Sequence, residues 1–429
     1  MASKFVLKLL RSGLAKSFLP SLDEFDVIGE PVFTRPSFLN TINELKVSYS
    51  KREEGSAAIV LITHIVLDDI AFHVLTSDGR LWSAGVDGGG CFLQGEYADE
   101  AIDLIAAITD VRFSSIWCNW ESRCGVDASG QVWFWGSQYG PEWGCGYVWP
   151  GIPTCPNSSP IAIEGGGTPG QYIYVKVAAS WPHAVGVTTA GKIYGWGFID
   201  DTWDPAGLGG TYPDTDVIWP VQEVTLKTDW VDVFAGKYAS AAIDSSGYLW
   251  VTGDNNYGRL GLGHDTHIFQ FTKVGSKTDW VWAGFGEMHM AALDASGDVW
   301  VWGDNYSGQL GSDALAEEEW SPVLVDPNQY GNKSVVQVSC GIYNTYILCG
   351  DGTLYVTGEN GDGECGLGHT TDIKNFTPIT SHLFTMVQGG MYNAMGVTSD
   401  NKVYYWGWAQ GLSEVHVPTE ISWLNSPFI

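Results

Sequence analysis

The sequence predicts an all-β fold, a seven-bladed β-propeller of four-stranded antiparallel blades. Three observations predict it. The 429 residues include 54 Gly, 21 Trp, 19 Tyr and 17 Phe but only 16% charged residues, which is typical of many short strands and tight turns. One hairpin pattern recurs seven times. Its second strand is apolar on both faces, as in VWVW at residues 299–302, so each sheet needs cover on both sides.

The repeated unit runs from an apolar residue through a short polar step and a turn to an aromatic strand that ends in Gly. Its period of about 50 residues leaves room for four short strands in each blade. The seven copies are LTSDGRLWSAG ending at Gly85, VDASGQVWFWG at Gly136, VTTAGKIYGWG at Gly197, IDSSGYLWVTG at Gly253, LDASGDVWVWG at Gly303, LCGDGTLYVTG at Gly358 and VTSDNKVYYWG at Gly407.

The turn of each hairpin needs a residue with positive φ, which Gly adopts without a steric penalty. Six copies place Gly there, at Gly79, Gly130, Gly191, Gly247, Gly297 and Gly352. The seventh copy has Asn401. Because Asn tolerates the left-handed region better than most other residues, the exception fits the same turn.

Short segments with Pro before apolar residues predict edge strands, where a missing N–H removes no ladder hydrogen bond. They occupy residues 160–163, 220–224, 322–325, 378–379 and 417–421. The last of these follows the seventh hairpin, and the first blade, which begins near Ala57, has no obvious upstream equivalent. We therefore expect the C-terminal strand to complete the first blade and close the ring, with the propeller spanning residues 57–429.

Three Gly-rich blocks carry a family resemblance. They are GDNNYGRLGLG at residues 253–263, GDNYSGQLG at 303–311 and GENGDGECGLG at 358–368. They resemble the signature of the regulator-of-chromosome-condensation repeat family, and the resemblance covers roughly residues 57–421. It implies a seven-bladed propeller. Long segments at residues 137–159 and 198–219 replace the short Gly-rich loop in the earlier blades.

The charge distribution argues against a nucleic-acid partner. The formal net charge is −28, and affinity for phosphates depends on Lys and Arg. Residues 1–56 hold eight basic and seven acidic side chains. Almost all of the excess of acidic over basic residues therefore follows a boundary near Gly55. The apolar run at residues 57–67 is too short to span a bilayer, and we expect a soluble protein without membrane insertion.

No catalytic motif is evident, so we expect a binding protein without cofactor or metal rather than an enzyme. The spacing of Gly361, Gly363 and Gly366 matches the glycine pattern of a dinucleotide-binding motif. That motif requires a βαβ unit around it, which the sequence does not predict here, so nucleotide binding is not expected. A group of acidic residues could bind calcium through its carboxylate oxygens, but a solvated acidic loop is the preferred interpretation. The group comprises Asp200, Asp201, Asp204, Asp214 and Asp216.

The eight cysteines lack paired C-x-x-C spacings, and free buried thiols are the preferred interpretation. Two pairs are candidates for disulfides. They are Cys118 with Cys124 and Cys145 with Cys155.

The two long segments contain the candidate binding residues. Aromatic side chains on rigid loops are typical anchors for protein or sugar partners; equally, these rings could fold back and cover the rim of the propeller. They are Trp143, Tyr147, Trp149, Trp203, Tyr212 and Trp219.

Residues 1–56 do not continue the repeat. The segments LLRSG at residues 9–13, GEPVF at 29–33 and LKVS at 45–48 resemble the short N-terminal module of bacteriophage tail-fibre proteins. The resemblance implies an attachment or oligomerisation segment that docks on other virion proteins and displays the propeller outward.

Two functions follow as hypotheses. The first is a structural component of a bacteriophage virion, such as a tail-fibre, receptor-binding or decoration protein, whose propeller contacts a host surface protein or polysaccharide. The alternative is a cytoplasmic regulator or scaffold of the kind found in the propeller family, such as a guanine-nucleotide exchange factor.

Overall fold

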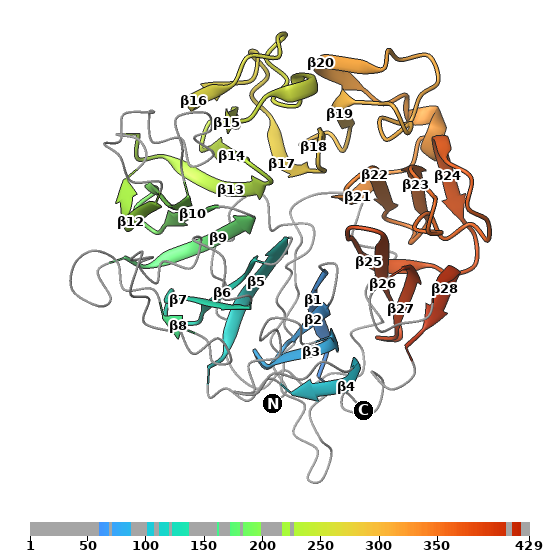
Figure 1. Cartoon of the computed structure of the whole chain (residues 1–429), viewed down its shortest axis with the longest axis horizontal. Coiled ribbons are helices and arrows are strands. Elements are labelled where there is room, and N and C mark those ends of the chain that lie inside the picture. The colour runs from blue at the N-terminus through green and yellow to red at the C-terminus, as the bar shows by residue number, and fades with distance from the viewer. Residues whose placement is uncertain are drawn as a thin grey trace, which may run out of the picture.

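Seven four-stranded antiparallel sheets are arranged radially around one axis, which confirms the predicted propeller (Figure 1). The computed structural model describes residues 60–67, 71–86, 101–106, 111–119, 122–136, 161–162, 172–180, 183–198, 217–223, 227–408 and 414–421. Residues 1–59 lie outside this set, so the boundary near residue 57 stays a prediction. Within the described residues, no helix has the length and apolar character needed to cross a bilayer.

Each blade is formed by four strands that follow one another in the chain. Blades 1 to 3 comprise β1 (Ile62–Leu67), β2 (Ala71–Thr76), β3 (Leu81–Val86) and β4 (Ala101–Ala106); β5 (Phe113–Asn119), β6 (Ser122–Asp127), β7 (Val132–Gly136) and β8 (Ile161–Ala162); and β9 (Tyr174–Ser180), β10 (His183–Thr188), β11 (Ile193–Phe198) and β12 (Val217–Glu223).

The later blades are described almost completely. Blades 4 and 5 comprise β13 (Trp230–Gly236), β14 (Ala239–Asp244), β15 (Leu249–Gly253) and β16 (Ile268–Lys273), then β17 (Trp280–Phe285), β18 (His289–Asp294), β19 (Val299–Asp304) and β20 (Glu318–Leu324). Blades 6 and 7 comprise β21 (Val335–Cys340), β22 (Asn344–Cys349), β23 (Leu354–Gly358) and β24 (Ile373–Ile379), then β25 (Phe384–Gly389), β26 (Asn393–Thr398), β27 (Val403–Gly407) and β28 (Val415–Glu420). Short 3-10 turns occupy Asn256–Gly258 and Pro327–Tyr330.

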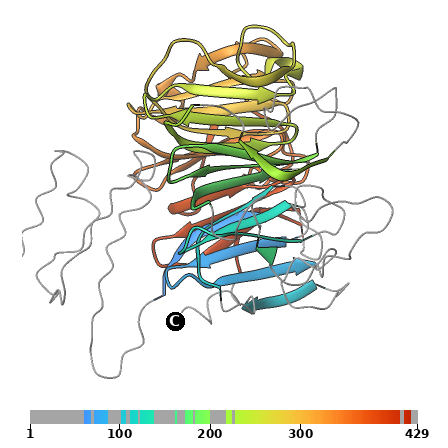
Figure 2. The same ribbon diagram turned by 90° about the vertical axis from the view of Figure 1, so that its left-hand side faces the viewer.

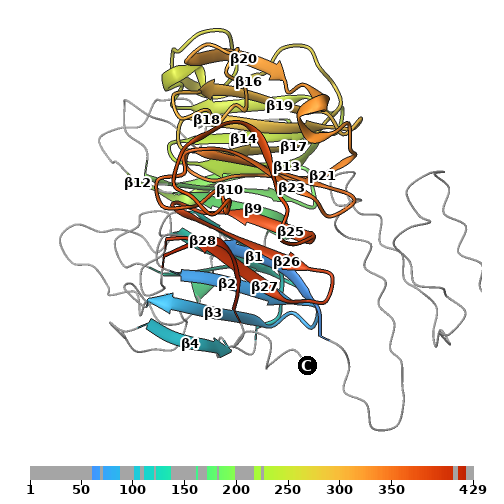
Figure 3. The ribbon, with the colours of Figure 1, turned by 90° about the vertical axis from the view of Figure 1, so that its right-hand side faces the viewer.

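The strands run along the ring axis, so their connections gather at two opposite faces (Figures 2 and 3). We call the face with the hairpin turns between the second and third strands the turn face. The other face, which carries the connections between the third and fourth strands, is the loop face. The first strand of each blade lies nearest the axis and the fourth lies at the outside (Figure 1).

The core lies between blades, as the two-sided apolar strands predicted. Every residue of the second strand is buried in blades 3 to 7. A cluster between blades 4 and 5 joins Phe234 and Leu249 to Trp280 and Trp302. Burying apolar side chains of this size contributes roughly 1.5–3 kcal/mol each, so each seam between neighbouring sheets makes a large contribution to stability.

A repeated aspartate shapes the turn face. The Oδ1 atom of Asp294 accepts the N–H groups of Ser296 and Asp298 at 2.9 and 3.0 Å, and its Oδ2 atom accepts the Trp300 indole N–H at 2.9 Å. Lys277 donates to the same carboxylate at 2.9 Å. Although burial opposes the change, these hydrogen bonds lower the pKa of Asp294. Asp244 in blade 4 makes the equivalent contacts with Trp250 and Lys227.

The predicted closure of the ring by the C-terminal strand is wrong. Strand β28, which contains most of residues 417–421, pairs with β27 in blade 7. The fourth strand of blade 1 is β4, which pairs with β3 and has the sequence AIDLIA without Pro. The edge strand therefore follows its own hairpin in every blade, and none of the described strands is exchanged between the two ends of the ring.

The ring is closed by packing and by Asn401. Side chains of β1 and β2, such as Ile65 and Phe72, pack against Met395 and Tyr405 of blade 7. In five other blades the carbonyl of the turn glycine accepts the first N–H of the next inner strand, at 2.8–3.1 Å. At the closing seam the side-chain oxygen of Asn401 accepts the N–H of Ile62 at 2.9 Å instead.

One candidate disulfide is also wrong. Cys124 is a free, buried thiol, and burial raises its pKa. In the β5–β6 ladder it lies opposite Trp117, while Cys118 lies opposite Arg123. Because Cys124 is free, it does not form a disulfide with Cys118. Cys145 and Cys155 lie outside the described residues.

Asn401 tests the closing seam. We expect Asn401→Ala to lower the free energy of unfolding by about 2 kcal/mol, because Ala is unfavourable at φ 65° and lacks the acceptor for Ile62. Asn401→Asp keeps both properties and should unfold like the wild type in urea. Equal unfolding curves for the Ala variant and the wild type would refute this role.

Candidate functional site

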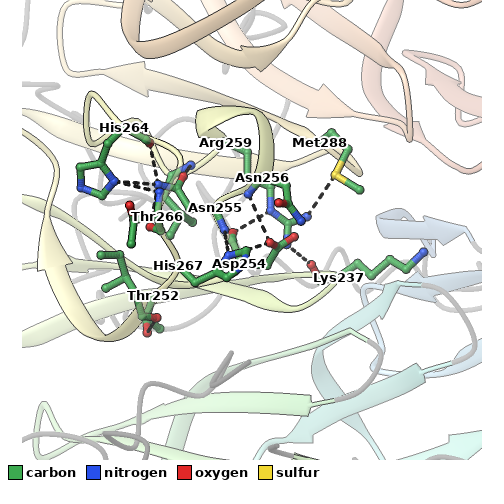
Figure 4. Close-up of polar contacts among 12 residues, drawn as sticks. Lys237, Thr252, Asp254, Asn255, Asn256, Arg259, His264, Thr266, His267 and Met288 are labelled. Carbon is green, nitrogen blue, oxygen red and sulfur yellow. Dashed lines mark hydrogen bonds and ion pairs between the residues drawn. The ribbon is translucent and has the colours of Figure 1, made fainter. Parts of the chain in front are cut away.

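The candidate site lies on the loop face of blades 4 to 6, where the three Gly-rich blocks form the connections between third and fourth strands. In each connection an Asn side chain fastens the loop. The side-chain oxygen of Asn255 accepts the N–H of Leu260 at 2.8 Å, and its amide group donates to the carbonyls of His264 and Thr266 at 2.7 and 3.1 Å (Figure 4). Asn305 and Asn360 bind their own loops in the same way.

Arg259 is the buried centre of the blade 4 loop. It is fully buried, and its guanidinium group forms an ion pair with Asp254 at 2.8 Å. It also donates to the carbonyl of Lys237 at 2.6 Å and to the carbonyl of Glu287. Figure 4 shows Arg259 between Asp254, Lys237 and Met288. Burial lowers the pKa of Arg259, while the charge of Asp254 opposes that change. One side chain thus joins the inner turns of blades 4 and 5.

The equivalent position differs in each loop. Gln309 occupies it in blade 5, where its amide donates to Asp304 at 2.7 Å and its oxygen accepts the N–H of Ser307 at 3.0 Å. Glu364 occupies it in blade 6, where its carboxylate accepts the N–H of Asp362 at 2.9 Å. Burial raises the pKa of Glu364 to about 7. The three loops share the hydrogen bonds of their Asn side chains but differ in the charge that they bury.

Each loop is held by the following blade. The Trp302 indole N–H of blade 5 donates to the carbonyl of Arg259 at 2.8 Å, and Trp406 of blade 7 donates to the carbonyl of Glu364 at 2.8 Å. Gly261 has φ 72°, and a Cβ there would lie 2.8 Å from the Trp302 indole nitrogen. The glycines of the repeat therefore permit both the turn and the contact between blades.

Polar side chains connect three blades at the mouth of the axial channel. Glu287 of blade 5 accepts from Lys237 of blade 4 at 2.7 Å and from the hydroxyl group of Tyr343 of blade 6 at 2.8 Å. Burial and this carboxylate raise the pKa of Tyr343. A cavity of about 130 Å³ lies in the channel, beside Glu287 and the inner strands β13, β17 and β21.

Two tyrosines on this face adopt a conformation that bulky residues rarely take. Tyr238, between β13 and β14, has φ 59°, and Tyr257, in the blade 4 loop, has φ 61°. Left-handed backbone at such residues costs roughly 1–3 kcal/mol and is concentrated at functional sites. Arg259 and Asn255 fix the surrounding loop, and Tyr257 is 43% exposed.

Exposed aromatic and acidic side chains form what we call the aromatic–acidic rim. Tyr306 is 77% exposed and Trp320 is 40% exposed. Trp320 lies against Gly258, next to Tyr257. A pocket of about 440 Å³ between blades 5 and 6 is lined by Tyr306 and by charged side chains. The rim comprises Tyr257, Tyr306, Asp313, Glu317, Glu318 and Trp320.

Only one of the predicted binding residues lies among those that the structure describes. Trp219 is in strand β12, while Trp143, Tyr147, Trp149, Trp203 and Tyr212 lie outside the described residues, as does the acidic group at residues 200–216. The role of those rings stays a prediction. The rim was not predicted from the sequence, although Tyr257 and Tyr306 lie within the Gly-rich blocks. Residues 361–366 connect the antiparallel strands β23 and β24, not a strand to a helix.

Comparison with known proteins establishes the family. Residues 51–381 match the RCC1-like domain. The chain belongs to the RCC1-like domain family. Two solved structures are similar to its propeller: Prp20p from Saccharomyces cerevisiae, with 17% identity, a TM-score of 0.66 and coverage of 84% of this chain and 87% of that chain, and human WBSCR16, with 19% identity, a TM-score of 0.65 and coverage of 76% and 85%. At such low identities they support the RCC1-like fold alone.

The curated relatives are much longer than the regions that match this chain. The ultraviolet-B receptor UVR8 of Arabidopsis thaliana is 29% identical over 239 residues, covering 54% of this chain and 41% of that protein. The E3 ubiquitin-protein ligase HERC2 of Homo sapiens is 29% identical over 247 residues, covering 55% and 5%. The X-linked retinitis pigmentosa GTPase regulator of Homo sapiens is 30% identical over 203 residues, covering 45% and 15%. The chain matches less than half the length of each.

The buried arginine gives a stability prediction for the RCC1-like loop. Arg259→Ala should lower the free energy of unfolding by roughly 3–5 kcal/mol, because it leaves the buried Asp254 carboxylate without its ion pair. Arg259→Gln should lower the free energy of unfolding clearly less, because a Gln can bind the aspartate of the loop, as Gln309 binds Asp304 in blade 5. Urea unfolding measures both, and equal losses for the two variants would contradict the equivalence of the loops.

The blade 6 carboxylate gives a pH prediction. Because the folded pKa of Glu364 is about 7 and its ordinary value is 4.5, its stabilising contribution is complete below pH 4.5 and is lost as pH rises through 7. Glu364→Gln should therefore unfold like the wild type near pH 4.5 and be more stable above pH 7, by on the order of 1–3 kcal/mol. Denaturant unfolding at both pH values measures the difference. A variant that is less stable than the wild type above pH 7 would contradict the assignment.

Proposed function

We propose that this chain is a non-enzymatic regulator or scaffold that binds a protein partner through the loop face of blades 4 to 6. One observation carries the proposal. Tyr257 and Tyr306 are exposed on loops whose backbone is fixed by the hydrogen bonds of Asn255 and Asn305. Trp320 is exposed on strand β20, against Gly258 of the Tyr257 loop. Aromatic side chains dominate the binding energy of protein interfaces, and a preformed loop loses little conformational entropy on binding.

The relatives support a regulatory role more than a structural one. One is a ubiquitin ligase and another a GTPase regulator, and the study of Prp20p concerns its binding to Gsp1p and histones. These properties belong to those proteins. They favour, for this chain, a partner that is itself a protein, and they make guanine-nucleotide exchange the finer form of the proposal to test first.

Site-specific cross-linking tests the loop face. A photoreactive phenylalanine analogue at Tyr306 should form a covalent adduct with the partner in cells, and excess wild-type chain should compete with it. The matched control is the same analogue at Ser296, an exposed residue of the turn face, which should give no such adduct. Equal labelling from both positions, or none from Tyr306, would refute the proposal.

A nucleotide-release assay tests the finer form. If the chain is an exchange factor, it should accelerate loss of labelled GDP from one member of a panel of small GTPases. The Tyr306→Ala variant should do so less well. Cross-linking from Tyr306 together with unchanged release across the panel would favour a scaffold over an exchange factor.

The virion hypothesis stays a prediction. It rests on residues 1–56, which lie outside the described residues, and the relatives reported above give it no support. Mass spectrometry of purified phage particles would test it directly, because a structural component must be present in them at defined stoichiometry.

A further inference from the structure

We infer that the segment bound by the aromatic–acidic rim is rich in Lys or Arg, and that one cationic side chain enters the pocket between blades 5 and 6. The inference rests on the proposed function, because it names the chemistry of the partner that the loop face would bind.

The pocket combines an exposed ring with carboxylates. Tyr306 lies on one side of it, and Asp313, Glu317 and Asp372 line it together with one base, Lys374. The N–H of Asn305 donates to the carbonyl of Glu317 at 2.8 Å, which holds the acidic segment beside the loop that carries Tyr306. A cation in this pocket would meet a ring face and several carboxylates at once.

The carboxylates of the rim are not neutralised within the described part of the chain. None of Asp313, Glu317 and Glu318 takes part in an ion pair there; Asp313 accepts only an amide hydrogen bond from Asn375 at 2.9 Å, and Glu318 accepts the Trp320 indole N–H at 2.8 Å. Carboxylates of the turn face differ. Lys227 and Lys277 each bridge two of them.

The turn face shows which ligand chemistry suits such a site. The Nζ atom of Lys277 lies 4.9 Å from the centre of the Trp300 ring while it pairs with Asp279 and Asp294. A cation is thus held between rings and carboxylates inside this fold. The rim offers rings and carboxylates, and Lys374, the one base that lines the pocket, forms no ion pair within the described part of the chain. A cation from a partner would therefore complete the same arrangement.

Charge complementarity excludes the opposite classes of partner. An anionic segment or a nucleic acid would meet uncompensated carboxylates on a chain of net charge −28, and like charges in an interface are costly. An apolar segment would leave the carboxylates of the pocket desolvated without a partner. A basic segment avoids both costs.

Fluorescence anisotropy with a defined probe tests the inference. The probe is a short labelled peptide that alternates Arg and Gly, and the control peptide has Gln in place of Arg. The full chain should bind the Arg peptide, more weakly as salt is raised, and should not bind the Gln peptide. Absence of binding to the Arg peptide at low salt would overturn the inference.

Variants separate the pocket from the general negative charge. Tyr306→Ala and Glu317→Gln should each weaken binding roughly two- to fivefold, whereas Lys374→Met should strengthen it by a similar factor because a repelling charge is removed. Asp298→Asn makes the same charge change as Glu317→Gln at the turn face and should have no effect. If Asp298→Asn weakens binding as much as Glu317→Gln, the binding is non-specific and the inference fails.

The two proposals can fail separately. If cross-linking from Tyr306 succeeds while the Arg peptide does not bind, the loop face binds a partner of other chemistry and only the inference is lost. If the peptide binds with the expected pattern of variants, the inference holds whichever partner the cross-linking identifies. If both experiments fail, the loop face is not a binding surface.

Discussion

The structure depends on one constraint, which is that each sheet is apolar on both faces and must be covered by a neighbour on either side. Buried second strands and seam clusters such as Phe234 with Trp280 satisfy it. The same constraint positions the site, because a loop of one blade is fixed by a side chain of the next, as Trp302 fixes the carbonyl of Arg259. Packing between blades and rigidity of the loop face therefore have a common origin.

Most of the fold could be predicted from the sequence because its signals are local. Each hairpin combines a turn residue with positive φ and a strand that is apolar on both faces, within a dozen residues of each other. These two signals together predicted all seven hairpins. The closure of the ring is not local. It was mispredicted because the Pro-containing edge segments were not assigned to the hairpins that precede them, and because β4 carries no Pro. The Asn401 side chain that replaces a glycine carbonyl at the seam was visible only as a tolerated turn residue.

The site could be predicted only in part, because composition does not reveal which rings are buried. Trp302 and Trp320 lie in strands of the same blade, yet Trp302 is fully buried against the Arg259 loop and Trp320 is exposed. Their difference depends on how blade 5 packs against blade 4, which no local pattern encodes. One signal was available: Arg259, Gln309 and Glu364 occupy the same place in three nearly identical blocks, and a change of charge at a constant position indicates that the loops are not chemically equivalent.

That inequivalence explains how a nearly symmetric ring can bind a partner in one orientation. The three loops share the hydrogen bonds by which Asn255, Asn305 and Asn360 fix them. The side chains at their exposed positions differ, so rings gather over blades 4 and 5 while the blade 6 loop offers Gly361 and Asp362. Lysines neutralise carboxylates at the turn face but leave those of the rim available. A basic segment would therefore be attracted to the loop face and held at blade 5, where the exposed Tyr306 ring and carboxylates without an ion pair in the described part of the chain border the pocket shared with blade 6.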